Sequence, residues 1–177
     1  MLAMPYDAAM EEFRAAWTEK VLHLRILCLA RVGDSPVMWA HYADQHKGVV
    51  LMLESSDERD SSTLLATPVI YRAEPPGLPL VDRWVRVFLG EEEVDWSEYF
   101  HECYYVKSPE WSYEQEYRAV SASLDVGSQY TDMEFLREDL VGVVLGANID
   151  PAEMEELREL AMEYPRAVVY SCLLYTS

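Results

Sequence analysis

Residues 38–54, MWAHYADQHKGVVLMLE, combine a helix pattern, a glycine and an apolar strand pattern. Asp34-Ser-Pro36 precedes them and supplies a cap residue and a proline suited to the first helical turn. Gly48 is a typical helix stop, and the VVLMLE run after it is apolar enough for an interior strand. The stretch therefore predicts a helix of about three turns, followed directly by a strand.

Helix and strand patterns alternate on both sides of this stretch. We expect an α/β or α+β fold, with a mixed β-sheet of about five to six strands layered with helices. Residues 1–170 are interpreted as a single domain. Helical spacing predicts helices over residues 8–21, 81–89, 96–103 and 150–164. Strands are predicted over residues 25–32, 67–72, 116–122, 140–146 and 166–170, and the polar run 55–62 is predicted to be a solvated loop.

The composition excludes several classes of partner. The net charge of −18 would repel a phosphate backbone or an anionic membrane surface. Three cysteines without metal-ligand spacing favour neither a disulfide framework nor a metal site, and Cys28 is interpreted as a buried apolar residue rather than a nucleophile. No signal-peptide pattern and no spanning apolar run is present, so we expect a soluble, cytoplasmic protein.

The predicted helix has two different faces. Met38, Trp39, Tyr42, Ala43 and His46 fall on one side, and His41, Asp44 and Gln45 fall opposite. One interpretation is a core helix with a hydrogen-bonded His46 near its end. The other is a ligand site in which His41 and Gln45 bind one group and Tyr42 donates its hydroxyl. The two histidines do not share a face, and a metal is not predicted.

A second candidate site lies in residues 113–118, YEQEYR. If this segment is extended, Glu114, Glu116 and Arg118 point to one face. Two carboxylates beside a guanidinium can keep one acid ionised and raise the pKa of the other, as a catalytic pair requires. The alternative is that Arg118 only neutralises the two carboxylates. The Glu-X-Glu element also resembles the catalytic end of ADP-ribosyltransferases, in which a glutamate stabilises the developing oxocarbenium ion; the pair His41-Tyr42 adds to this similarity.

Several motifs together resemble the bacterial family called domain of unknown function 2971. The similarity covers roughly residues 25–165 and implies no established activity. It rests on Leu27-Cys-Leu29, MWAHYADQHKGVVL, VIY at 69–71, Lys107 with WSYEQEYR at 111–118, and VVLG at 143–146. Family members usually begin with a further segment of strands, so we expect a fragment incomplete at its N-terminus. Residues 171–177, SCLLYTS, resemble a translated sequencing adapter and are expected to be a non-native tail.

Three functions follow from these patterns. The first is binding of a nucleotide or other small ligand between the MWAHYADQHKG helix and the WSYEQEYR element, through His41, Tyr42, Gln45, Trp111 and Arg118. The second is an NAD-using transferase or hydrolase with Glu114 or Glu116 as its catalytic residue. The third is a non-catalytic interaction module whose acidic surface binds a basic partner. The patterns assign no cofactor and no oligomeric state.

Overall fold

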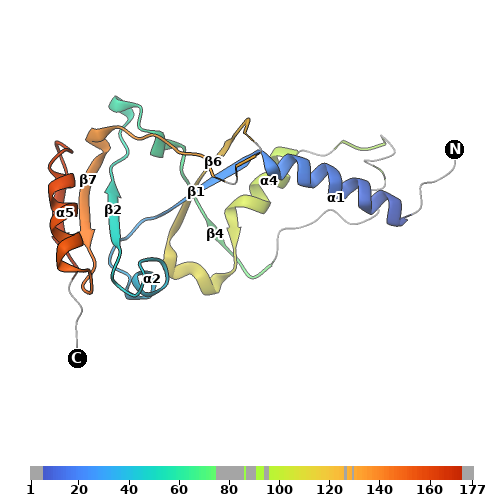
Figure 1. The fold of residues 1–177 in the computed structure, drawn as a ribbon. Helices are drawn as coiled ribbons and strands as arrows, with labels where there is room; N and C mark the ends of the chain where they lie inside the picture. The colour runs from blue at the N-terminus through green and yellow to red at the C-terminus, as the bar shows by residue number, and fades with distance from the viewer. Residues whose placement is uncertain are drawn as a thin grey trace.

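The computed structural model describes residues 6–74, 86, 91–93, 96–125, 127–128 and 130–172, and it has an α+β fold (Figure 1). The α-helices are α1 (Tyr6–Leu22), α2 (Pro36–Tyr42), α4 (Trp96–Tyr105) and α5 (Pro151–Ala161). The strands are β1 (Leu24–Ala30), β2 (Val49–Leu53), β3 (Thr67–Pro68), β4 (Ile70–Tyr71), β5 (Val106–Lys107), β6 (Glu116–Ala122), β7 (Leu140–Leu145) and β8 (Val168–Ser171). Short 3-10 helices are η1 (Asp57–Arg59), η2 (Ser62–Leu65), η3 (Pro109–Glu114) and η4 (Arg137–Asp139). The predicted helix over 81–89 lies outside the described residues, apart from Arg86.

The strands form three small sheets, with orders β1-β6-β3, β2-β7-β8 and β4-β5. In the first, β1 and β6 are antiparallel, with Cys28 opposite Arg118 and Ala30 opposite Glu116. In the second, β2 and β7 are antiparallel, while β7 and β8 are parallel and are connected through α5. The predicted class is confirmed, and its strands are divided among these sheets rather than paired in one.

A buried hydrophobic cluster lies between α5 and the sheet β2-β7-β8 (Figure 1). Leu140, Val143, Leu145 and Ala161 are each at most 5% exposed at its centre. Asp150 caps α5, as predicted, because its Oδ1 accepts a hydrogen bond from the backbone N–H of Ala152 at 2.8 Å. This packing fixes the position of β7 and, through it, of β2.

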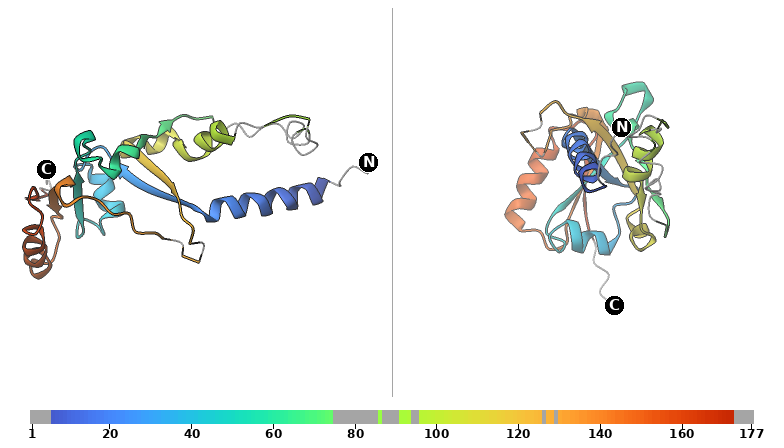
Figure 2. Two further views of the ribbon diagram at one scale, coloured as in Figure 1. Left: turned by 90° about the horizontal axis from the view of Figure 1, so that it is seen from above. Right: turned by 90° about the vertical axis from the view of Figure 1, so that its right-hand side faces the viewer.

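The helix predicted over 8–21 is confirmed as α1. It extends away from the sheets, as Figure 1 and the left view of Figure 2 show. Val21 and Leu22 at its end are 39% and 49% exposed. In the part of the chain that the structure describes, no helix is both long enough and apolar enough to cross a membrane.

The helix at residues 36–47 is shorter than predicted. Helix α2 ends at Tyr42, and Asp44, Gln45 and His46 then adopt positive φ angles of 43°, 55° and 68°. This turn is held from outside, because the backbone O of His46 accepts a hydrogen bond from the N–H of Asn148 at 2.9 Å. Tyr42, predicted on the packed side, has a 64% exposed side chain, because the short helix buries only Trp39.

The structure also differs from two other predictions, the strand over 67–72 and the loop over 55–62. The strand over 67–72 is divided at Val69, whose N–H donates to the backbone O of Glu116 at 2.9 Å; β3 pairs with β6, and β4 pairs with β5. The run 55–62 is not simply solvated, since it contains η1 and Ser61 is 2% exposed. Arg59 in η1 reaches a buried partner, Asp139, at 2.7 Å.

Candidate functional site

Four charged side chains meet beside the start of β6 and form what we call the ion-pair cluster: Lys107, Glu114, Glu116 and Arg118. They come from β5, from the end of η3 and from β6. Gln115 links η3 to β6 with a left-handed φ of 45°, so that the chain turns sharply between the two glutamates. Glu114 is therefore not on the strand, so the extended conformation considered for residues 113–118 is present only from Glu116 onward.

Both carboxylates are almost completely buried, with residue exposures of 3% for Glu114 and 5% for Glu116. Arg118 donates to Glu116 through Nε at 2.7 Å and through Nη2 at 3.1 Å. Lys107 Nζ bridges the two acids, with 3.0 Å to Glu116 Oε2 and a shorter contact to Glu114 Oε2. A guanidinium and an ammonium thus neutralise the pair of acids.

Two tyrosines attach the ion-pair cluster to other elements. The hydroxyl of Tyr42, in α2, donates to Glu114 Oε1 at 2.7 Å. The hydroxyl of Tyr71, in β4, accepts a hydrogen bond from the N–H of Glu116 at 2.8 Å. With the donors Tyr42, Lys107 and Arg118 taken together, each of the four carboxylate oxygens of Glu114 and Glu116 accepts a hydrogen bond.

The surroundings shift the pKa values of several of these groups. Burial raises the pKa of Glu116, but hydrogen bonds from Arg118, Cys28 and Lys107 outweigh burial and lower this pKa to about 2. Burial lowers the pKa of Lys107, but its hydrogen bonds to Glu114 and Glu116 leave the pKa raised overall. The hydrogen bond to Glu114 raises the pKa of Tyr42. Glu116 and Lys107 therefore both carry their charge at neutral pH.

The structure brings together some of the predicted site residues. Tyr42, Glu114, Glu116 and Arg118 join in one network, and Trp111 lies beside it, with its ring centroid 4.9 Å from Lys107 Nζ. Trp111 is itself 41% exposed and shields one side of the ammonium group. The predicted roles of these residues stay predictions.

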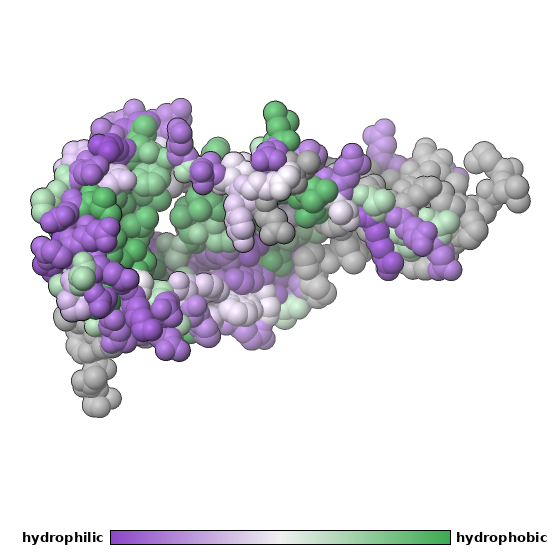
Figure 3. All heavy atoms as spheres, in the orientation of Figure 1, coloured by the Kyte–Doolittle hydropathy of each residue, from purple (hydrophilic) through white to green (hydrophobic). Residues whose placement is uncertain are grey.

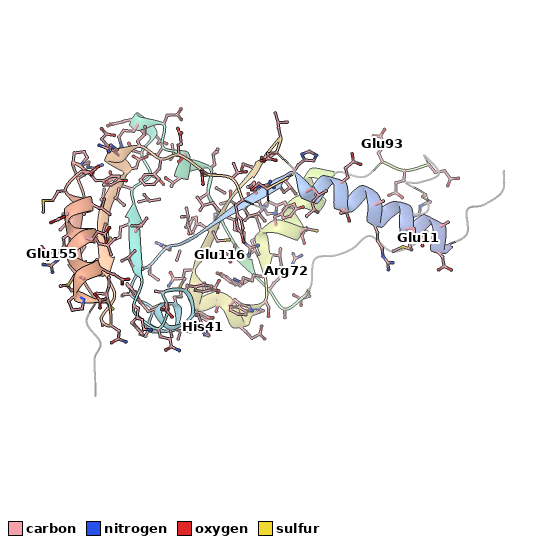
Figure 4. All side chains as sticks on the ribbon, viewed as in Figure 1. Glu11, His41, Arg72, Glu93, Glu116 and Glu155 are labelled. Atoms are coloured by element: carbon pink, nitrogen blue, oxygen red, sulfur yellow. The ribbon has the colours of Figure 1, made fainter. Side chains whose placement is uncertain are left out.

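His41 and Gln45 lie apart from the network. Figure 4 shows Glu116 near the middle of the molecule and His41 on α2, away from it. His41 is exposed, with its ring 6.3 Å from that of Tyr42. Gln45 is also exposed and accepts through its backbone O a hydrogen bond from Asn148 Nδ2 at 3.1 Å. His46 stacks on Trp39 at 6.0 Å instead of continuing the helix.

Lys107 is the functional residue that pattern reasoning did not assign to the site. It lies seven positions before Glu114 along the chain, and only the connection through η3 brings the two side chains together. The signal available in the sequence was the family resemblance, in which Lys107 precedes WSYEQEYR at 111–118. The prediction that Cys28 is buried is wrong, because the residue is exposed on β1. Partial burial of its thiol and a hydrogen bond to Glu116 raise the pKa of Cys28.

A cavity of about 650 Å³ opens between β1, α2, β2 and η2. Figure 3 shows apolar residues on both sides of a hollow between β2 and the β1–β6 pair. Its lining is mostly apolar, with Cys28, Arg31, Ser35, Tyr42, Ser55 and Thr63 as the chief polar contributors. The other lining residues are Leu29, Ala30, Val32, Gly33, Met38, Trp39, Ala43, Val49, Val50, Leu51, Met52, Leu53, Leu64, Ala66 and Tyr117. Tyr42 lines this cavity and also bonds to the ion-pair cluster, so it connects the two features.

A second charged network holds the other end of β2. Asp139 is 0% exposed and pairs with Arg59, while Glu54 accepts from Arg59 at 2.8 Å and from Arg166 at 2.5 Å. The hydrogen bond from Arg59 lowers the pKa of Asp139. These contacts join η1, η4, the residue after β2 and the segment before β8, and none of the four side chains lines the cavity. No group of three or more metal-ligating side chains is found among the described residues.

The fold and the site define an α+β domain with a buried ion-pair cluster next to an apolar cavity. The family model described as protein of unknown function (DUF2971) matches residues 38–119. Membership of this family, predicted from the motifs in the sequence, is confirmed for that segment, which contains α2, both glutamates and Arg118. No curated protein and no solved structure matches the chain.

Proposed function

We propose that this protein is a binding module whose ligand enters the cavity between β1, α2 and β2, and that the ion-pair cluster supports the wall of this cavity. The size of the cavity supports the proposal, because ligand pockets commonly have volumes of roughly 300–1,000 Å³ and a mostly apolar lining with few polar groups. The lining includes Met38, Trp39 and Tyr42 from α2 and Tyr117 from the WSYEQEYR element. Both sequence motifs therefore contribute to the wall of the cavity.

The observation that carries the supporting role of the cluster is the complete pairing of its carboxylates. A glutamate that stabilises a cation in a transition state needs an oxygen that can face the substrate. In Glu114 and Glu116, all four oxygens already accept hydrogen bonds from Tyr42, Lys107 or Arg118. An ionised but fully paired Glu116 is better suited to fixing β6 against β5 than to catalysis.

The lining also favours one type of ligand over another. Arg31 is the single charged residue among the lining residues, and none of them forms a glycine-rich phosphate loop. The two or three phosphates of a nucleotide would therefore meet few cations. A neutral, largely apolar ligand fits the cavity better.

Binding can be measured with the neutral fluorescent probe N-phenyl-1-naphthylamine, which avoids repulsion by the acidic chain. Ala66 lines the cavity, and Ala66→Phe adds a ring there; Ala122 at the far end of β6 is exposed and outside the lining, so Ala122→Phe is the matched control. We expect Ala66→Phe to weaken probe binding about tenfold, equivalent to ~1.4 kcal/mol, and Ala122→Phe to leave it unchanged.

A second perturbation is introduced into the cavity only after the protein has folded. In protein carrying Cys103→Ser and Cys172→Ser, N-ethylmaleimide reacts after folding with Cys28, which lines the cavity. We expect this modification to reduce probe binding as Ala66→Phe does. Equal binding before and after modification, together with equal binding by the two phenylalanine variants, would overturn the proposed site.

The catalytic alternative has its own test. We expect no difference in NAD consumption between the wild-type protein and Glu116→Gln. Measurable NAD consumption by the wild type that is lost in this variant would instead assign Glu116 to catalysis.

A further inference from the structure

Two strand edges face the cavity. In β1 and the residues after it, Cys28 to Gly33 all line the cavity, and in β2, Val49 to Leu53 all do so. A strand that presents one face to a cavity contributes every second residue, whereas a strand that presents its edge contributes consecutive residues. β1 and β2 are also the terminal strands of their sheets. The cavity is therefore bounded by two edges.

The hydrogen-bond pattern of β1 shows which backbone groups point to the cavity. The N–H of Arg31 donates to Gln115 O at 3.1 Å, and the N–H of Ser123 donates to His23 O at 2.6 Å, at the two ends of the β1–β6 ladder. Antiparallel pairing alternates along a strand, so Leu27 and Leu29 bond to β6. The N–H and C=O of Ile26, Cys28 and Ala30 consequently point away from β6, toward the open edge.

The backbone groups of β2 alternate in the same way between β7 and the open edge. The N–H of Gly146 donates to Gly48 O at 3.0 Å, just before the register pair Val49–Leu145. Val50 and Met52 therefore bond to β7, and the N–H and C=O of Val49 and Leu51 point away from it. Among the described residues, no third strand pairs with either edge.

We propose that the cavity binds an extended polypeptide segment, which adds as a strand between β1 and β2 and joins their two sheets into one. This inference rests on the proposed binding function and names its class of ligand. Only an extended backbone offers alternating N–H and C=O groups on both of its sides, as Cys28 and Ala30 on one edge and Val49 and Leu51 on the other require. A compact apolar molecule would fill the space and leave these groups unpaired.

The lining of the cavity and the net charge of the protein indicate the composition of the bound segment. A strand paired on both sides and covered by apolar neighbours is apolar on both faces, as interior strands are. The length of β2, 5 residues, sets the length of the apolar core. The net charge of −18 favours basic residues on either side of that core, since opposite charges accelerate and strengthen association.

The probe for this proposal is the synthetic peptide KKVIVTVKK, added to the full chain. We expect the amides of Cys28, Ala30, Val49 and Leu51 to exchange rapidly with deuterium in the free protein and to become at least about tenfold slower with peptide. Leu27 and Val50, which already pair with β6 and β7, serve as internal controls and should change little. Nuclear magnetic resonance resolves the individual amides.

Two control peptides separate strand addition from other binding. N-methylation of alternate core residues removes about half of the N–H donors of the core and keeps its side chains; we expect about tenfold weaker binding. EEVIVTVEE keeps the core and reverses the charge, and should also bind more weakly. Equal binding by the N-methylated peptide, or unchanged exchange at Ala30 and Leu51 with KKVIVTVKK at saturation, would overturn the strand proposal.

The two proposals fail in different ways. If N-phenyl-1-naphthylamine binds in the cavity and the peptide protects no edge amide, the binding function stands and the class of ligand is wrong. If the Ala66→Phe variant and the modification of Cys28 leave probe binding unchanged, the cavity itself is not the binding site, whatever the peptide does elsewhere.

Discussion

Glu116 carries a negative charge in a nearly closed environment because two cations and a backbone contact surround it. Arg118 and Lys107 supply the donors to its carboxylate, and the N–H of Val69, between β3 and β4, donates to its backbone O. A buried charge is costly when its partner is removed, because the remaining charge cannot be solvated. The stability of this part of the molecule therefore depends on each member of the ion-pair cluster.

Replacement of Glu116 tests this dependence. Glu116→Gln keeps the shape of the side chain but leaves Lys107 and Arg118 with an excess of positive charge. We expect the free energy of unfolding to fall by about 3 kcal/mol, the lower end of the range for breaking a buried pair, because Lys107 is partly exposed. Urea denaturation measures the change. The control Glu110→Gln, at an exposed position in η3, should change stability by less than about 0.5 kcal/mol.

The pH dependence of stability gives an independent test. The pKa of Glu116 is lowered from 4.5 to about 2 in the folded protein. A carboxyl group with a lowered pKa stabilises the fold above its unfolded pKa, and this contribution is lost as the pH falls toward the folded pKa. We expect the difference in stability between wild type and Glu116→Gln to be constant above pH ~5 and to shrink between pH ~5 and ~2. A difference that is the same at pH ~3 and pH ~7 would contradict the lowered pKa.

Single residues could be predicted where local spacing alone sets their direction. Glu116 and Arg118 were expected on one face because alternate residues of a strand point the same way, and Arg118 does pair with Glu116. The partner Lys107 could not be predicted, since its contact depends on how η3 turns the chain. His41 was expected as a candidate ligand residue, and no sequence pattern could place it apart from the ion-pair cluster.

At the level of elements, the turn after α2 depends on a contact with the end of β7. The backbone of residues 44–46 adopts the left-handed region three times in succession, which costs free energy for residues other than glycine. Hydrogen bonds from Gly146 and Asn148 to Gly48 and His46 offset this cost. A Cβ atom on Gly146 would lie 2.1 Å from the backbone O of His46, so only glycine permits this approach.

Substitution of this glycine should open the turn. Gly146→Ala forces the turn away from β7, and we expect a loss of roughly 3 kcal/mol or more, above the usual cost of overpacking, because backbone atoms must move. The matched control is Gly33→Ala, whose Cβ would meet only Val50 at an ordinary 3.4 Å. Thermal unfolding followed by circular dichroism measures both. A small effect of Gly146→Ala, similar to that of Gly33→Ala, would contradict the close contact.

Elements with strong local signals were predicted well. The strand over 116–122 has the bounds of β6, and the Asp150-Pro151 start of α5 was read from its cap residue. Gly48 predicts a helix that continues to residue 47, but α2 ends at Tyr42. Hydrogen bonds from Gly146 and Asn148 hold the turn that follows it, and the local sequence does not indicate these contacts. The strand over 67–72 was predicted as one because its change of partner, from β6 to β5, is a property of the tertiary structure.

For the molecule as a whole, the arrangement of the sheets has the largest consequence for function. Composition and alternation of elements predicted the α+β class and helices layered on strands. They could not predict that β1 and β2 are the terminal strands of two separate sheets. Which strands pair, and in which register, depends on contacts between residues far apart in the sequence. Unpaired edges are usually protected in proteins, so two edges that face one cavity point to an occupant.

Addition of a strand between β1 and β2 requires that both edges are open in the protein without a ligand. Amide hydrogen exchange of the ligand-free chain, resolved by residue, measures this. We predict alternation along both strands: exchange at Ile26, Cys28 and Leu51 at least about tenfold faster than at Leu27, Leu29 and Val50, whose amides pair with β6 or β7. Equal, strong protection of neighbouring amides along β1 and β2 would show that both edges are already paired, and would contradict the cavity and its proposed function together.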